Sequence, residues 1–393
     1  MGWCTAAMRK TGETVRIGSG DHAYSAFVPF PLPPAPPVDL NASDRDLLAG
    51  ATQALRGLDA VTSLLPDTSL FIYAYVRKEA LVSSQIEGTQ SSLSDLLLYE
   101  SDQLPGVPLE DVREVSDYVA ALDHGLARLR GGFPLSLRLI REIHGVLLRG
   151  GRGRHSDPGE FRRSQVWIGG SRPGNARFVP PPADRVIDCM GALERFLHGE
   201  PVETTTLIKA ALAHVQFETI HPFLDGNGRV GRLLITFLLC AEGALSEPIL
   251  YLSLHFKSHR QEYYDHLQRV RTAGDWEGWI RFFLEGVIQT ADEAVSATRR
   301  ILARFEQDRR ALEGLGRAAG SALRVHDYLK KKPISGIREI EKAVRLSYPT
   351  VASALESMKK RRIVEEITGY RRNRVFAYAP YVAVLSEGTE PIR

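Results

Sequence analysis

The chain has 393 residues, of which 44% are hydrophobic and 25% charged, a composition typical of a globular protein of two or three domains and unlike a disordered or fibrous chain. Its three cysteines are odd in number and widely spaced, which argues against a disulfide framework and favours a reducing, cytoplasmic compartment. The longest apolar run, at 233–241, is too short to cross a bilayer, and the N-terminus lacks the apolar core of a signal peptide. No membrane role is therefore expected.

The net charge of +3 is unevenly distributed along the chain. Residues 321–380 carry 14 Lys and Arg against 6 Asp and Glu, so the rest of the chain is net negative. A basic terminal segment on a mildly acidic body is typical of a nucleic-acid-binding module. A solvated, lysine-rich surface would produce the same excess.

Helical periodicity dominates the chain after a proline-rich N-terminal arm. Residues 1–42 are expected to form an N-terminal arm or linker, in which the proline-dense stretch VPFPLPPAPP is extended and solvated. The one strand signal in the body is residues 164–182, SQVWIGGSRPGNARFVPPP, where two β-prone runs around a Gly/Pro/Asn turn predict a hairpin. Helices are expected from apolar spacing at 43–98 (with a break at EGTQ), 109–130, 134–149, 183–198, 203–217 and from Gly228 to about Gly314.

The segment HPFLDGNGRVGR, residues 221–232, collects a histidine, an acid, three glycines and two arginines. Within it, GNGRVG matches the G-x-G-x-x-G pattern of dinucleotide-binding proteins. That pattern follows a β-strand, whereas the preceding TTTLIKAALAHVQFETI has apolar residues at helical spacing. The sequence therefore predicts a helix, a loop and a second helix, and excludes the dinucleotide fold.

The residue types in this segment favour chemistry on a phosphorylated ligand. The N–H groups at the start of a helix form an anion site, and glycines let phosphate oxygens approach them. Arg229 and Arg232 are three residues apart, so both can reach further phosphate oxygens. Asp225 is a suitable Mg²⁺ ligand beside phosphates, and His221 can accept a proton near neutral pH. Together they suggest transfer of a phosphorus-centred group to a hydroxyl.

HPFLDGNGRVGR resembles the signature of the Fic (filamentation induced by cAMP) family, HxFx[D/E]GNGRxxR, at every fixed position. Members of that family have an all-helical core and mostly transfer AMP from ATP to a Ser, Thr or Tyr hydroxyl of a target protein. The resemblance implies that His221 is the base and that Asp225 holds Mg²⁺ between the α- and β-phosphates. The related Doc subgroup has a lysine in place of Gly228 and phosphorylates instead, so adenylylation is favoured here. The implied nucleotide contacts are Phe223, Asp225, Gly226, Asn227, Gly228, Arg229 and Arg232, with Arg232 on the γ-phosphate.

A second stretch, SSQIEG at 83–88, resembles the Fic inhibitory motif [S/T]xxxE[G/N]. On its residues alone, Ser83 and Glu87 are an i, i+4 pair near a helix end with Gly88 as its cap. A glutamate at a helix C-terminus is unfavourable towards the helix dipole, so a cationic partner is expected. The resemblance implies that this partner is Arg232, which would then be lost to the γ-phosphate.

Two further groups are candidates for contacts with target and nucleotide. The hairpin at 164–182 would be the family's flap, whose exposed strand pairs with an extended target segment, and Gln165 and Ile168 are its candidate contacts. A simple edge hairpin is the alternative. Tyr263 and Tyr264 are candidates for the adenine pocket, although tyrosines at helical spacing also serve as core.

The basic C-terminal segment reads as helix, turn, helix and hairpin, and it resembles a winged helix domain. Its recognition helix would be residues 347–360, opening at Ser347 with Pro349 in the first turn. Arg371, Arg372 and Arg374 would lie in the wing. DNA binding would explain the excess of positive charge, but winged helices also serve as protein-interaction and dimerisation modules.

The predicted architecture is an all-α Fic core, a helical bundle with a small β-hairpin flap, followed by a C-terminal winged helix-turn-helix domain. The leading hypothesis is a cytoplasmic protein adenylyltransferase that uses ATP and Mg²⁺, modifies a target protein or itself, releases pyrophosphate and is autoinhibited through Glu87. The alternatives are a DNA-binding regulator whose Fic body senses nucleotides, and an enzyme that removes AMP with Glu87 orienting water. Similar proteins often form homodimers. The expected domains are a 1–42 arm, a 43–125 helical region with the inhibitory motif, a 126–315 catalytic domain and a 318–385 winged helix domain.

Overall fold

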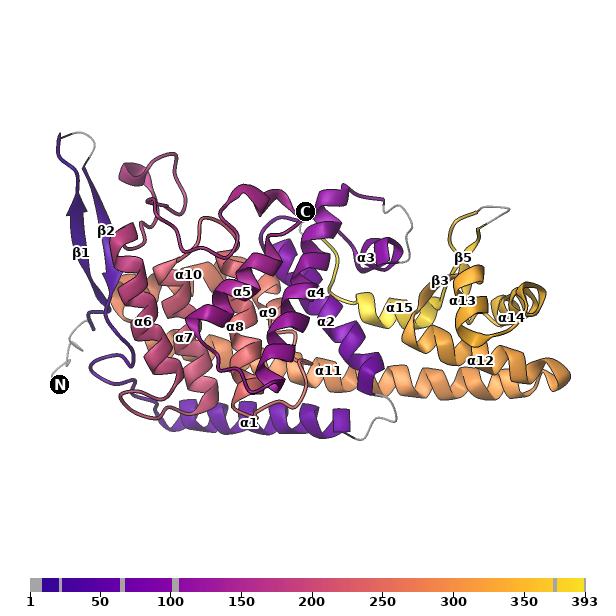
Figure 1. Ribbon diagram of the computed structural model, residues 1–393. Helices are drawn as coiled ribbons and strands as arrows, with labels where there is room; N and C mark the ends of the chain where they lie inside the picture. The colour runs from indigo at the N-terminus through magenta and orange to yellow at the C-terminus, as the bar shows by residue number, and fades with distance from the viewer. Residues whose placement is uncertain (1–8, 21–22, 64–67, 101–105, 370–372, 392–393) are drawn as a thin grey trace. The chain divides into compact units, whose positions relative to one another are not determined.

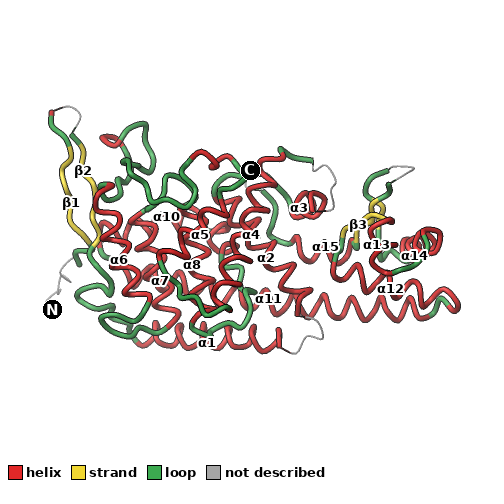
Figure 2. Tube along the Cα trace, viewed as in Figure 1, coloured by secondary structure: helices red, strands yellow, loops and turns green. Residues whose placement is uncertain are grey.

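The computed structural model describes residues 9–20, 23–63, 68–100, 106–369 and 373–391. Helices predominate, and the strands are few and short (Figure 2). Among the described residues, no helix combines the length and the hydropathy needed to cross a membrane. The chain divides into two compact units: the first contains Met1–Arg56, Asp117–Pro248 and His255–Thr290, and the second contains Gly57–Ser116, Ile249–Leu254 and Ala291–Arg393.

The core of the first unit is a bundle in which α7 (Thr206–Ile220) is central (Figure 1). Residues 207–220 are all buried, as expected of a helix enclosed on every side. α7 and α8 can approach closely because Gly231 has no side chain: an added Cβ would lie 2.4 Å from Glu218 Oε1. Around α7 pack α6 (Val186–Leu197), α8 (Asn227–Ala241) and α10 (Arg260–Ala273), while α5 (Leu137–Leu147) packs on α6 and α8.

The N-terminal arm contains two strands that were not predicted from the sequence. Strands β1 (Gly12–Ile17) and β2 (Tyr24–Pro29) form an antiparallel hairpin with Thr14 paired to Phe27. Ala26 and Val28 are buried while Ser25 and Phe27 are not, an alternation with the period of a strand. The short runs, flanked by Gly, Ser and Pro, hid that period.

The second unit contains α2 (Thr68–Ile86), α3 (Leu93–Glu100) and the basic C-terminal segment. Two helices are present where the sequence predicted them, α13 (Ile337–Val344) and α14 (Tyr348–Lys360), and an antiparallel strand pair follows, β4 (Glu365–Glu366) and β5 (Val375–Ala377). A strand that was not predicted, β3 (Ile334–Gly336), completes a sheet of order β3-β5-β4 because it pairs with β5. Arg371 and Arg372 lie outside the described residues. α12 (Ala319–Lys331) and α15 (Ala379–Ser386) flank these elements and both pack against α2.

The remaining helices carry residues of both units or join the main elements. The expected helices at 109–130, 134–149, 183–198 and 203–217 are confirmed within a few residues. The other helices are α1 (Ala42–Ser63), α4 (Leu109–Arg130), α9 (Ser253–Ser258) and α11 (Trp276–Glu313), with single 3-10 turns at Arg152–His155, Pro173–Asn175, Ala183–Arg185 and Gly316–Ala318.

Candidate active site

His221 occupies a left-handed turn at the C-terminal end of α7. Its φ is +50°, and its N–H donates to Phe217 O at 2.9 Å, closing the last turn of the helix. A non-glycine residue in this region costs on the order of 1 kcal/mol or more, so surrounding contacts must hold it there. His221 as a whole residue is half-buried.

The loop after His221 is closed from within by Asn227. Its side chain accepts from Phe223 N–H at 2.8 Å and donates to Phe223 O at 2.9 Å, so both ends of the amide are satisfied. Asn227 is 2% exposed and Phe223 is completely buried. Both side chains therefore hold the loop, and a contact of Phe223 with the nucleotide stays a prediction. The main-chain N–H of Asn227 can still donate a hydrogen bond to an anion.

His144 supports the same loop from α5. Its ring stacks on Phe223 with centroids 3.7 Å apart, and its Nδ1 accepts from Gly159 N–H at 2.8 Å. Because Nδ1 accepts, Nε2 carries the proton and donates to Asp225 O at 3.1 Å. Burial lowers the pKa of His144 to about 4, so the ring is neutral at pH 7, as this bonding pattern requires.

Asp225 presents a carboxylate at the start of α8. Its Oδ1 accepts from Gly226 N–H at 2.6 Å and lies 3.7 Å from the Arg229 guanidinium, while its side chain is 44% exposed. Space beside Oδ2 exists because residue 153 is glycine: a Cβ there would lie 2.5 Å from that atom. One accessible carboxylate fits Mg²⁺, which takes one or two carboxylates together with phosphate oxygens. No group of three or more His, Cys, Asp or Glu among the described residues could hold a metal by itself, so any ion here needs ligand oxygens as well.

The first turn of α8 brings positive charge to this loop. Gly226 adopts φ +75° as the N-cap, and the helix starts at Asn227. The first N–H groups of a helix have no partner inside it and carry partial positive charge. Arg229 and Arg232 are 3% and 2% exposed, so their charges act in a site largely shielded from water. The arrangement is suited to a phosphorylated ligand.

The two tyrosines proposed for the adenine pocket differ in position. Tyr263 is 1% exposed, and its hydroxyl is 2.8 Å from Nε2 of the buried His214, which itself contacts Gly231 O on α8. Tyr263 therefore belongs to the core that joins α7, α8 and α10. Tyr264 is only partly buried, and its contact with adenine stays a prediction.

The predicted flap hairpin is reduced to one antiparallel bridge. Ile168 and Phe178 exchange backbone hydrogen bonds of 2.8 and 3.1 Å, and the Gln165 side chain donates to Pro180 O at 3.0 Å. The far side of the flap is braced by the N-terminal hairpin, because Phe27 N–H donates to Val179 O at 2.9 Å. Trp167, next to the bridge residue Ile168, is exposed.

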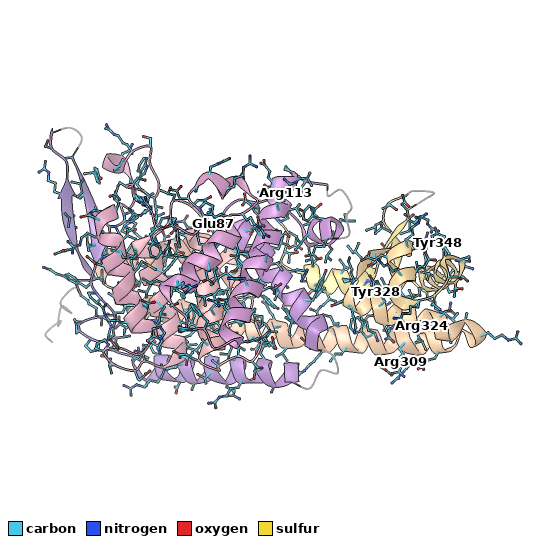
Figure 3. All side chains as sticks on the ribbon, viewed as in Figure 1. Glu87, Arg113, Arg309, Arg324, Tyr328 and Tyr348 are labelled. Carbon is cyan, nitrogen blue, oxygen red and sulfur yellow. The ribbon has the colours of Figure 1, made fainter. Side chains whose placement is uncertain are left out.

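The inhibitory motif lies at the end of α2 in the second unit. Ser83 is fully buried, whereas Glu87 is exposed just after the helix and Gly88 has φ +104°, as expected of a glycine cap (Figure 3). Between them, Gln85 donates to Thr389 O at 2.8 Å, so the C-terminal tail is fastened to this helix end. Glu87 and Arg232 belong to different units, and their pairing stays a prediction.

Three supporting residues were not predicted: His144, Arg162 and His214. The only local signal for the two histidines was a polar side chain at a position where the helix pattern predicts an apolar one. His144 lies among the buried positions of α5, and His214 lies within the apolar α7. Arg162 is 2% exposed although it stands in a loop. A buried charge of this kind is seen only in the structure.

A helical bundle that presents a histidine, a carboxylate and a basic helix start from one loop has the features of a phosphate- or nucleotide-binding protein. Comparison with known proteins identifies which nucleotide-binding family these features resemble. Residues 45–127 match the Fic/DOC family N-terminal model, and residues 134–239 match the Fic/DOC family model. The chain therefore contains a region that matches the Fic/DOC family N-terminal model, followed by a region that matches the Fic/DOC family model.

Relatives of known name and structure agree with this assignment. The chain is 34% identical over 253 residues to Protein adenylyltransferase Fic of Aedes aegypti, covering 61% of this chain and 46% of the relative. It is 34% identical over 221 residues to the protein of the same name from Culex quinquefasciatus, covering 54% of this chain and 40% of that one. The chain thus spans less than half the length of these curated relatives. A crystal structure of a Fic family protein from Desulfovibrio desulfuricans G20 shares the fold, with a TM-score of 0.58, 19% identity and coverage of 87% of this chain and 97% of that one.

Proposed function

We propose that this protein is an adenylyltransferase that transfers AMP from ATP to a Ser, Thr or Tyr hydroxyl of a target protein. The carrying observation is the segment of residues 221–232, in which His221 ends α7, Asp225 offers a partly exposed carboxylate and α8 begins at Asn227. The names of its relatives, each a protein adenylyltransferase, support the same activity. A general base, a hard oxygen ligand and an anion cradle are what this reaction needs.

In the proposed reaction, the hydroxyl oxygen of the target attacks the α-phosphorus of ATP. The bond from that phosphorus to the β-phosphate oxygen breaks, and pyrophosphate leaves. His221 takes the hydroxyl proton, and its left-handed turn fixes where the imidazole stands. The α8 N–H groups and Arg229 bind phosphate oxygens. Mg²⁺ held by Asp225 would neutralise phosphate charge.

We further propose that Glu87 restrains this reaction by pairing with Arg232. Glu87 is exposed after the end of α2, where a carboxylate faces the negative end of the helix dipole. An arginine paired with this glutamate is unavailable to the γ-phosphate, and ATP would then bind in a pose unsuited to in-line attack. The pairing leaves nucleotide binding possible and lowers the rate of transfer.

The activity and its restraint are tested by two substitutions in the full chain. Glu87→Gly should raise incorporation of labelled AMP into the protein itself by at least about tenfold, because Arg232 is released to the γ-phosphate. His221→Ala in the Glu87→Gly background should abolish incorporation, because the hydroxyl loses its base. Mass spectrometry should find one AMP unit on a hydroxyl side chain.

The controls separate the alternatives. His198→Ala, a histidine at the C-terminal end of α6, should leave incorporation unchanged. ATP binding without any AMP transfer by Glu87→Gly would contradict the proposal and favour a nucleotide sensor. Loss of AMP from a modified protein that requires Glu87 would instead favour an enzyme that removes AMP.

A second candidate function, DNA binding, is favoured by the C-terminal segment. We propose that α12–α14 and the β3-β5-β4 sheet form a winged helix, because this order of helices and strands, with two helices joined by a short turn, is that of the motif. Tyr348 is 39% exposed at the start of α14 (Figure 3). Arg345 is exposed in the turn before this helix. Arg374, placed in the wing by the sequence, is paired with Glu356 and so is less available to a phosphate.

DNA binding is tested by titrating the full chain with a duplex of about 30 base pairs at two salt concentrations. Arg345→Ala with Tyr348→Ala should weaken binding at least about tenfold and reduce the salt dependence. Arg309→Ala, an exposed arginine on α11 paired with Glu313, is the matched control and should leave affinity unchanged. Equal weakening by the control, or no binding at low salt, would leave protein interaction as the role of this module.

A further inference from the structure

Arg162 is a buried arginine between the 152–155 turn and the flap, and its role is not explained by the proposed reaction. It is 2% exposed, and all of its hydrogen-bond partners among the described residues are carbonyl oxygens. Burial lowers the pKa of Arg162 to about 10, so the guanidinium is still charged at pH 7. A buried charge costs free energy unless its donors are satisfied, so this placement needs a reason.

One set of bonds from Arg162 reaches the turn that carries His221. Its Nε donates to His221 O at 2.8 Å and its Nη2 to Ile220 O at 3.4 Å, while its main-chain N–H donates to Pro222 O at 2.9 Å. The last carbonyls of α7 have no partner inside the helix and carry partial negative charge, so a cation stabilises them. These bonds hold the left-handed residue in place.

A second set of bonds reaches both ends of the flap. Nη1 donates to Ser164 O at 3.1 Å, where the flap begins, and Nη2 donates to Pro181 O at 2.6 Å, where it ends. The bridge between Ile168 and Phe178 lies between these two ends. One planar group thus connects the base-bearing turn with both stems of the target-pairing segment. A lysine ammonium cannot do this, because it lacks the guanidinium fork.

We propose that Arg162 is a positioning residue that fixes the flap relative to His221, so that a hydroxyl presented on the flap strand meets the base. This inference rests on the proposed adenylyl transfer, in which the acceptor is a protein segment. Arg162 itself touches neither substrate nor nucleotide. Its loss should therefore harm transfer to a protein hydroxyl more than attack by water, which needs no alignment by the flap.

The test compares the double variant Glu87→Gly/Arg162→Gln with the single variant Glu87→Gly, each as the full chain with Mg²⁺–ATP. ATP affinity should stay within about threefold, because the 225–232 cradle is untouched. Self-modification should fall relative to release of free AMP by at least about tenfold, since displacement of a reacting group by about 1 Å can cost up to a hundredfold. The rate of amide hydrogen exchange in peptides from 164–182 should rise in the double variant. It should also rise in the single variant Arg162→Gln, which retains Glu87.

Two variants guard against a simple loss of folding. Arg9→Gln is the matched control, because Arg9 is mostly buried and bonds Gly274 O, Pro37 O and Glu277, none of which belongs to the loop or flap. It should change neither the reaction ratio nor flap exchange. If Arg162→Gln does not fold, Arg162→Lys keeps the charge and should show the same lower ratio and faster flap exchange.

The outcomes distinguish this inference from the proposed function. If Glu87→Gly transfers no AMP, the proposed function fails while flap exchange still tests whether Arg162 fastens the segment. If Glu87→Gly is active and Arg162→Gln lowers transfer and water attack in the same proportion, Arg162 is merely structural and the proposal is wrong. Unchanged exchange across 164–182 would overturn it equally.

Discussion

Within residues 221–232, two side chains that the sequence motif names as nucleotide contacts also hold the loop together. The side-chain amide of Asn227 makes two hydrogen bonds with the main chain of Phe223, and the Phe223 ring stacks on His144. The main-chain N–H groups at the start of α8 and the partly exposed Asp225 carboxylate remain available to a ligand. At this scale the site is a rigid loop whose shape depends on buried polar groups, and each of those groups should be intolerant of small changes.

Asn227→Asp tests this division of labour with a nearly isosteric change. The new carboxylate oxygen would face Phe223 O without a proton to donate, and its charge would oppose bound phosphates. We expect a loss of stability of about 1 to 3 kcal/mol, because a buried acceptor is left unsatisfied. ATP affinity should fall at least about tenfold, as followed by calorimetric titration and thermal unfolding.

Asn175→Asp is the matched control for this substitution. Asn175 is exposed at the tip of the flap, where its Oδ1 accepts from Ser171 and Arg172 N–H, an interaction that a carboxylate keeps. It should leave both measurements nearly unchanged. Equal ATP affinity in Asn227→Asp and wild type would show that the amide does not shape the anion site.

The helices and turns were predictable from sequence because their signals are local. Apolar residues recur at helical spacing in α4 to α8, and Gly226 marks the break before α8. The N-terminal hairpin and β3 were missed because short strands are stabilised mainly by their pairing partners, which a single stretch of sequence does not contain. Tertiary partners decide such elements.

The same distinction applies to the candidate site. Its reactive residues lie within twelve consecutive positions, so one motif reveals them. Arg162 and His144 act on that motif from 59 and 81 residues away, through carbonyl oxygens that every residue has and no motif records. Gln85 is similar, because it sits inside the inhibitory motif yet bonds Thr389 O, 304 residues later. Supporting contacts of this kind require the fold.

Across the whole chain, buried neutral histidines tie elements together in both units. His144 and His214 in the first unit and His326 in the second are each completely buried. His326 lies 3.0 Å from the Tyr378 hydroxyl and so links α12 to the residue that follows β5. Burial lowers the pKa of these histidines to about 4, 3 and 4, respectively. The charged form is therefore excluded from the folded state at neutral pH.

Stability should consequently fall on mild acidification. The unfolded chain gains protons at these histidines below about pH 6.5, whereas the folded chain does not until about pH 4. The contribution of the neutral histidines to the free energy of unfolding is therefore complete above pH 6.5 and is lost as the pH falls towards 4. Between pH 6.5 and 5 the expected loss is on the order of 2 kcal/mol for each histidine. Carboxylates with lowered pKa, such as Glu277 and Glu387, lose their contribution only below their ordinary value of 4.5. Thermal unfolding at pH 7.5, 6.5, 5.5 and 5.0 should therefore show Tm constant above pH 6.5 and falling by several degrees below it, and a constant Tm down to pH 5.0 would contradict the neutral, buried state of these rings.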